Sequence, residues 1–217
     1  MLRKTLVALA LGLGLAIIIV AFAVKDRRPV LVCLGDSLTS CGGPNGHYSD
    51  YLQRELPDIR VINSGIGGDT LEGAWARFER DVLRYKPRAV LIALGANDFW
   101  QNSREVSEMR QDLENMIIEL QARNCRIVVA DCFGDRDLWN EVSTEFSPRR
   151  NKLAADIGAM QTELCRKYGC VYVPNLQLDI KPNRLPPYWD ETDHPSPKGN
   201  EQVAMRLLPA IRKAWEQ

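Results

Sequence analysis

Four short stretches of the chain carry side chains that could perform nucleophilic chemistry. The Gly-Asp-Ser-Leu run at 35–38 would place the hydroxyl of Ser37 in a sharp turn at the start of a helix, where a backbone N–H can face a developing oxyanion. The glycines at 65–68 would let the backbone come close to a substrate, and the Gly-Ala-Asn-Asp run at 95–98 offers a side-chain amide as a donor. A histidine follows late in the chain, in the Asp-His-Pro run at 193–195. A nucleophile, a base and hydrogen-bond donors are the groups that acyl transfer requires.

Apolar runs alternate with amphipathic ones along the chain, and this alternation predicts where the four stretches lie. Five short, nearly continuous apolar runs indicate strands buried on both faces of a parallel sheet: 30–34, 59–63, 89–94, 126–130 and 171–173. Helices are expected at 48–56, 71–86, 104–123, 148–168 and 197–215. The order predicts a three-layer, doubly wound α/β sandwich of the flavodoxin-like kind, with a five-stranded parallel sheet. Ligands bind beyond the carboxyl ends of such strands, which is where the four stretches fall.

Each stretch alone has a structural explanation, because such runs commonly form turns and a histidine commonly caps a helix. Their joint occurrence in this order resembles the SGNH/GDSL hydrolase superfamily, over about residues 30 to 205. The resemblance implies that Ser37 is the nucleophile and that His194 is the general base. It also implies an oxyanion hole formed by the N–H groups of Ser37 and Gly68 and by the side-chain amide of Asn97.

The third member of the catalytic triad departs from the family pattern, in which an aspartate stands three residues before the histidine. That position holds Glu191 here, with Asp190 and Asp193 on either side. A glutamate can also orient an imidazole, so spacing favours Glu191, with Asp190 as the alternative. Asp193 is adjacent to His194 and is poorly placed to fold back onto its ring. A dyad in which a backbone carbonyl orients His194 also remains open.

Other residues near these stretches are expected to play lesser roles. Asp36 and Asp69 are interpreted as structural, holding turns through bonds to the backbone. Phe99 and Trp100 follow the asparagine stretch and are either walls of an acyl or aryl pocket or simply core residues. His47 lies in a glycine-rich loop before a helix and is expected to cap that helix or face the substrate rather than act as the base.

Three functions are compatible with these motifs to different degrees. The resemblance implies hydrolysis of a carboxylic ester or thioester, such as a lysophospholipid, an acyl-thioester or a small acyl ester. An alternative on the same fold is removal or transfer of acetyl or other acyl groups on a cell-surface polysaccharide. A nucleotide-binding domain is disfavoured, because the glycine run follows the second strand and lacks the G-x-G-x-x-G spacing. The hydrolytic chemistry needs only side chains and water, so no metal or organic cofactor is expected.

The first 24 residues differ in composition from the rest and are expected to form an export or anchor segment. Arg3 and Lys4 precede 20 uncharged, mostly apolar residues at 5–24, which as a helix would be about 30 Å long, near the thickness of a bilayer. The segment is therefore either a membrane-spanning helix or a signal peptide cleaved after the small-x-small site Ala21-Phe22-Ala23. Either alternative predicts a hydrolase domain at 29–217 that lies outside the cytoplasm.

The charge balance argues against a nucleic-acid partner, and the cysteine spacing argues against a structural zinc site. The 217 residues include 28 basic and 28 acidic side chains. The chain therefore lacks the excess of basic residues that is typical of nucleic-acid-binding proteins. The six cysteines contain no Cys-x-x-Cys pair, which disfavours a structural zinc site. If the domain is exported, Cys165 and Cys170 are the pair expected to form a disulfide. A small-molecule or lipid acyl ester is the expected partner, and the motifs do not predict an oligomeric state.

Overall fold

The computed structural model describes residues 26–131, 148–176, 187–190 and 194–217. The strands are β1 (Val30–Gly35), β2 (Arg60–Gly65), β3 (Ala89–Ala93), β4 (Arg126–Ala130) and β5 (Val171–Val173). The helices are α2 (Ser37–Ser40), α3 (Tyr48–Glu55), α4 (Leu71–Ala76), α5 (Phe78–Asp81), the short 3₁₀ helix η1 (Leu83–Tyr85), α6 (Ala96–Gln101), α7 (Val106–Gln121), α9 (Pro148–Tyr168) and α10 (Pro197–Glu216).

The strands form one parallel sheet in the order β2-β1-β3-β4-β5, which confirms the predicted five-stranded, doubly wound architecture. In the centre of the sheet, Val32 of β1 lies opposite Ile62 of β2 and Val90 of β3. Every residue of β1 and β3 is buried, whereas the edge strand β2 is largely half-buried. The continuous apolar runs in the sequence thus reflect strands that are covered on both faces.

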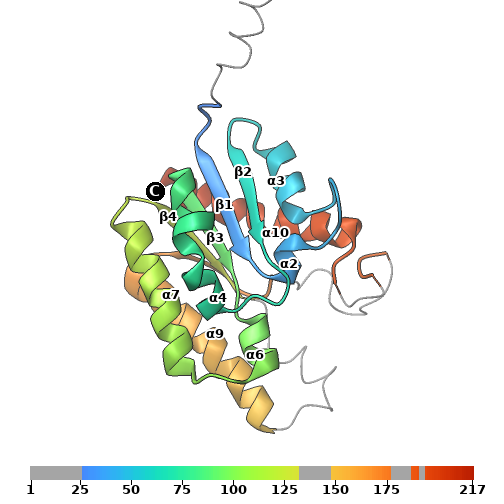
Figure 1. Ribbon diagram of the computed structural model, residues 1–217. Helices are drawn as coiled ribbons and strands as arrows, with labels where there is room; N and C mark the ends of the chain where they lie inside the picture. Colours follow the sequence, from blue (N-terminus) through green and yellow to red (C-terminus); the bar gives the residue numbers. More distant parts are fainter. Residues whose placement is uncertain (1–25, 132–147, 177–186, 191–193) are drawn as a thin grey trace, which may run out of the picture.

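Helices cover the two faces of the sheet and produce two separate apolar cores (Figure 1). On one face, alternate strand residues such as Val32 and Ile92 pack against α4, α5, α7 and α9. On the other face, Leu31 and Leu91 pack against α3 and α10. Residues that alternate along a strand point to opposite faces, so this division follows directly from strand geometry.

Two helical regions differ from the sequence-based expectation. The single helix expected at 71–86 is divided into α4, α5 and η1, because the backbone leaves helical geometry at Arg77 and again at Val82. The first interruption allows the Arg77 side chain to turn inward toward the strand ends, where its guanidinium donates to two backbone carbonyls. Helix α6, directly after β3, was not expected as a separate element.

The expected anchor or signal segment at 1–24 lies outside the described residues. Among the residues that the structure does describe, no helix combines the length and the apolar character needed to cross a membrane.

Cys165 and Cys170 lie close together where α9 ends. Gly169 adopts a positive φ of 68° there, and the N–H of Cys170 donates to the carbonyl of Cys165 at 2.9 Å. Both side chains are free thiols. A hydrogen bond between the two thiols raises the pKa of Cys165 and lowers the pKa of Cys170. The two cysteines of the predicted pair are therefore in contact.

Candidate active site

Ser37 is the first residue of α2 and stands directly beyond the carboxyl end of β1, as predicted. We call residues 35–38 the nucleophile turn. Asp36 caps the helix, because its carboxylate accepts the N–H of Leu38 at 2.9 Å. A glycine is required at the base of this turn, since a Cβ at Gly35 would lie only 1.9 Å from the hydroxyl oxygen of Thr39. Among the described residues, none is hydrogen-bonded to the half-buried Ser37 hydroxyl.

Gly68 lies in a tight turn that follows β2, formed by residues 66–69 and called here the glycine turn. The N–H of Asp69 donates to the carbonyl of Ile66 at 3.2 Å, which closes the turn. Gly68 occupies the third position with a φ of 79°, a value that favours glycine in turns of this kind. Within the described part of the chain, no acceptor is bonded to the Gly68 N–H, so it is available as a donor.

Asn97 connects the two turns through its side-chain amide. It lies in the first turn of α6, and its Nδ2 donates to the carbonyl of Asp69 at 2.9 Å and to the carboxylate of Asp36 at 3.3 Å. The glycine turn and the nucleophile turn are therefore held on either side of one amide. Burial raises the pKa of Asp36 to about 7.

His194 lies just before α10, in a loop held against the end of α2. The backbones of His194 and Asp190 are joined by a 2.9 Å hydrogen bond, and the carboxylate of Asp190 accepts the N–H of His194 at 3.1 Å. Asn200, in the first turn of α10, donates to the carbonyls of Cys41 and Gly46, both at 3.0 Å. Cys41 caps the end of α2, so Asn200 links the histidine loop to the helix that carries Ser37.

Asn200 was not identified from the sequence. It is completely buried, yet a lone asparagine inside an amphipathic helix carries no signal of its partners in a loop 154 residues away. Glu191 and Asp193, the other candidates beside Asp190 for orienting His194, lie outside the described residues. No hydrogen bond joins Ser37 to His194, and catalytic contacts of this kind often close only around a bound substrate.

The residues that follow Asn97 separate into core and surface. Asp98 accepts the N–H of Leu71 through both carboxylate oxygens, at 3.3 and 3.1 Å, and burial raises its pKa to about 6. Phe99 is 1% exposed and belongs to the core, so the pocket-wall alternative is wrong for this residue. Trp100 is 44% exposed and is covered in part by the guanidinium of Arg150, 5.7 Å from the ring centroid.

His47 serves as the cap of α3. Its Nδ1 lies 2.8 Å from a carboxylate oxygen of Asp50, which also accepts the His47 backbone N–H at 3.0 Å. This arrangement satisfies the start of the helix and agrees with the capping role expected from the sequence.

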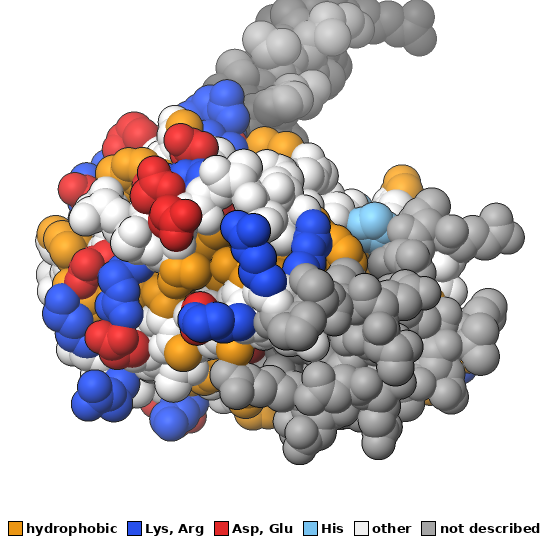
Figure 2. Space-filling model, turned by 90° about the horizontal axis from the view of Figure 1, so that it is seen from below, with side chains coloured by type: hydrophobic (Ala, Val, Ile, Leu, Met, Phe, Trp, Pro, Cys, Tyr) orange, Lys and Arg blue, Asp and Glu red, His pale blue; other side chains and the backbone are white. Residues whose placement is uncertain are grey.

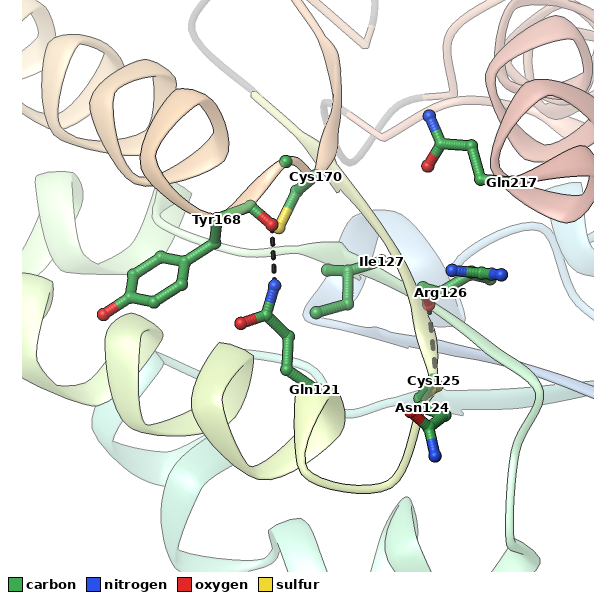
Figure 3. Close-up of a pocket in the computed structure, with 9 residues that line it drawn as sticks. Gln121, Asn124, Cys125, Arg126, Ile127, Tyr168, Cys170 and Gln217 are labelled. Atoms are coloured by element: carbon green, nitrogen blue, oxygen red, sulfur yellow. Dashed lines mark hydrogen bonds between the residues drawn. The ribbon is translucent and has the colours of Figure 1, made fainter.

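The face at the carboxyl ends of the strands carries the site (Figures 1 and 2). Figure 2 shows a histidine side chain exposed on this face, near several lysine and arginine side chains. A cavity lined by residues of α7, β4 and the α9–β5 connection, including Gln121, Arg126 and Tyr168, lies instead at the opposite end of the sheet (Figure 3). It surrounds the first residues of β4 and therefore is not the site of Ser37 and Asn97. Among the described residues, no group of three or more His, Cys, Asp or Glu side chains could hold a metal ion.

Comparison with known proteins agrees with this arrangement. Residues 33–202 match the model of the GDSL-like Lipase/Acylhydrolase family. An acetylxylan esterase of Geobacillus stearothermophilus is 40% identical, over 85% of this chain and 94% of the relative. An acetylxylan esterase of Xylanibacter ruminicola is 29% identical, over 88% of this chain and 44% of the relative. The crystal structure of the psychrotrophic esterase EstA from Pseudoalteromonas superimposes with a TM-score of 0.71, at 23% identity and covering 87% and 99% of the two chains. The chain therefore belongs to the GDSL-like lipase/acylhydrolase family and is an esterase of the SGNH type.

Proposed function

We propose that this esterase cleaves its substrate through an acyl intermediate on Ser37, and that the substrate is an acetyl ester carried by a polysaccharide. The observation that carries the first part is the bridging position of Asn97. Its side-chain amide holds the Asp69 carbonyl at 2.9 Å and donates its second N–H to Asp36 over a longer 3.3 Å; transfer of this second N–H from Asp36 to the substrate oxygen would give the third donor beside the N–H groups of Ser37 and Gly68. Such preorganised donors are what a tetrahedral intermediate of acyl transfer requires.

Each step of the reaction can be assigned to a group of this chain. The Ser37 hydroxyl attacks the ester carbonyl while His194 accepts its proton, and the oxyanion is bound by the N–H groups of Ser37 and Gly68 and by the amide of Asn97. His194 then protonates the departing alcohol, which leaves an acyl-Ser37 ester. Water attacks this ester in the same way, with His194 again as the base, and releases the carboxylic acid and free serine.

Glu191 is proposed to orient His194 from the side opposite to Ser37. The spacing of three residues supports Glu191, and the Asp190 carboxylate is already bonded to the backbone N–H of His194 at 3.1 Å. Replacing the orienting acid by its amide favours the wrong imidazole tautomer and lowers kcat by up to about 10⁴-fold. Glu191→Gln should therefore be clearly worse than Asp190→Asn or Asp193→Asn at equal thermal stability. A crippled Asp190→Asn would move the assignment to Asp190, and three active variants would indicate a Ser37–His194 dyad.

Two observations support an acetylated polysaccharide over a lysophospholipid or an acyl-thioester. Two relatives that align over most of this chain bear the name acetylxylan esterase. In addition, Trp100 stands one helical turn from Asn97, so both project from neighbouring positions on α6. Trp100 is 44% exposed, and the guanidinium of Arg150 lies 5.7 Å from the ring centroid, so an aromatic group and a hydrogen-bond donor are both available to a sugar beside Asn97.

Residues 5–24 are proposed to direct the domain out of the cytoplasm, as a membrane anchor or a cleaved signal peptide. The basic leader and the uncharged run support this. Fractionation of cells that express the full chain tests the proposal. The enzyme should be in the membrane or secreted fraction, and intact full-length enzyme in the cytosol would contradict it.

The function is tested with a hydrolysis panel and two matched serine variants. The panel contains p-nitrophenyl esters of increasing chain length, acetylated xylan, palmitoyl-CoA and lysophosphatidylcholine. Acetylated xylan and the shortest ester should be the best substrates. Ser37→Ala should lower kcat by several orders of magnitude and abolish labelling by a fluorophosphonate, since the triad acts as a unit. Ser40→Ala, at the other end of α2, should change neither.

More than a tenth of wild-type turnover in Ser37→Ala would remove Ser37 from the mechanism. A preference for palmitoyl-CoA or lysophosphatidylcholine would leave the acyl-enzyme mechanism intact and would contradict the polysaccharide substrate.

A further inference from the structure

Arg77 is a buried arginine that lies between the two turns of the active site and has no part in the chemistry assigned so far. Its side chain is 8% exposed. The guanidinium donates to the backbone carbonyls of Gly35 at 3.2 Å and Ser64 at 2.9 Å. It also pairs with Asp69 at 2.7 Å and with Asp81 at 3.2 Å. One side chain thus joins the carboxyl ends of β1 and β2 to two carboxylates.

These partners belong to the turns that carry the proposed oxyanion donors. Gly35 is the first residue of the nucleophile turn, and Asp69 is the last residue of the glycine turn. The backbone carbonyl of Asp69 in turn accepts the amide of Asn97 at 2.9 Å. A shift of the Arg77 guanidinium would therefore move the positions of all three donors relative to one another.

The chemistry of the guanidinium suits this task. It is planar and always charged, and its five N–H groups are held in a fixed arrangement, so it can bind two carbonyls and two carboxylates at once. Because the group is buried, its bonds are not exchanged for bonds to water. A lysine at this position would keep the charge opposite Asp69, but one ammonium lacks the span to hold both strand ends.

We propose that Arg77 is a positioning residue for the oxyanion hole, acting through the nucleophile turn and the carboxylate of Asp69. This inference rests on the proposed function, since it concerns the donors that stabilise the tetrahedral intermediate on Ser37. Displacing such donors by about 1 Å is enough to lower turnover about 10²-fold. Both formation and hydrolysis of the acyl-enzyme should be slowed, because both pass through an oxyanion.

The experiment measures kcat per active site in Arg77→Lys and Arg77→Met. A fluorophosphonate titration, taken to completion, counts the molecules with a reactive Ser37, and hydrolysis of p-nitrophenyl acetate is divided by that count. We expect full titration in the lysine variant, with kcat per titrated site reduced about 10²-fold and KM little changed. Arg80→Met is the matched control. Arg80 also bonds to Asp81, but its side chain is 66% exposed, so this variant should keep wild-type turnover.

A merely structural role would lower the number of titratable sites and leave kcat per site at the wild-type value, which would overturn the proposal. Arg77→Met leaves the buried carboxylate of Asp69 without its charged partner, whereas Asp81 keeps Arg80, and it is the variant at risk of unfolding. In that event Arg77→Lys decides the question, and failure of the lysine variant to fold would make the arginine purely structural. Absence of labelling or hydrolysis in the wild-type enzyme would instead refute the proposed function itself.

Discussion

The buried carboxyl group of Asp36 should make the stability of this protein depend on pH in a direction unusual for an aspartate. Asp36 is fully buried, and this burial raises its pKa to about 7, although the N–H of Leu38 and the amide of Asn97 favour the ionised form. In the unfolded chain an aspartate titrates near a pKa of about 3.9. Between these two values the folded protein binds a proton that the unfolded chain has released.

The sign of the effect follows from this difference in proton binding. At about pH 4 and below, Asp36 is protonated in the folded protein at no cost to the free energy of unfolding. As the pH rises toward the folded-state pKa of about 7, the free energy of unfolding falls. The two pKa values correspond to a loss of about 4 kcal/mol in the free energy of unfolding. Asp98, whose pKa burial raises to about 6, adds a smaller loss in the same direction.

Urea unfolding between pH 4 and pH 8 measures the effect in the wild type and in Asp36→Asn. Between pH 4 and pH 8 the wild type should lose about 4 kcal/mol in free energy of unfolding that Asp36→Asn does not lose, so the variant gains by this amount relative to the wild type. Asp81→Asn is the control. Bonds from Arg80 lower the pKa of Asp81 to about 2, so its stabilising contribution is lost only as the pH falls below about 4. This variant should be less stable by the same amount from pH 5 to pH 8. Parallel profiles for wild type and Asp36→Asn would refute the reasoning.

Three other features of the structure lead to measurable expectations. Asn97→Ala should lower kcat by roughly 10²–10³-fold with little change in KM, because its bond matters mainly in the transition state; a raised KM at unchanged kcat would make Asn97 a substrate-binding residue. Trp100→Ala should raise KM for acetylated xylo-oligosaccharides but not for p-nitrophenyl acetate, and an equal effect on both substrates would exclude a sugar contact. Trp215→Ala, which removes a tryptophan stacked 4.9 Å from the guanidinium of an arginine, should change neither KM. Cys165 and Cys170 should transfer two electrons and two protons to a disulfide oxidant such as oxidised glutathione and form an intramolecular disulfide. This bond should stabilise the fold by about 2 kcal/mol. If both thiols can still be alkylated after oxidation, the expectation is wrong.

Helix α6 shows how neighbouring residues can differ in what their sequence reveals. Phe99 and Trp100 are both large aromatic side chains, and their types alone could not separate core from surface. Packing of α6 beside α9 buried Phe99 in the core and left Trp100 at 44% exposure near Arg150. The division depends on the angle at which α6 leaves β3, which no local pattern encodes.

Local patterns by themselves determined the five strands, the doubly wound order and the placement of Ser37, Gly68 and Asn97 on neighbouring strand exits. Apolar runs, turn glycines and helix caps depend on residues close together in the chain, so they can be identified from the sequence without knowledge of the fold. Only the tertiary structure decided which side chains from distant parts of the sequence hold these strand ends in place relative to one another. Arg77 interrupts a predicted helix to reach two strand ends, and Asn200 fastens the histidine loop to the nucleophile helix. Both act through bonds to backbone carbonyls far away in sequence, and because every residue carries such a carbonyl, only the folded chain selects the partner.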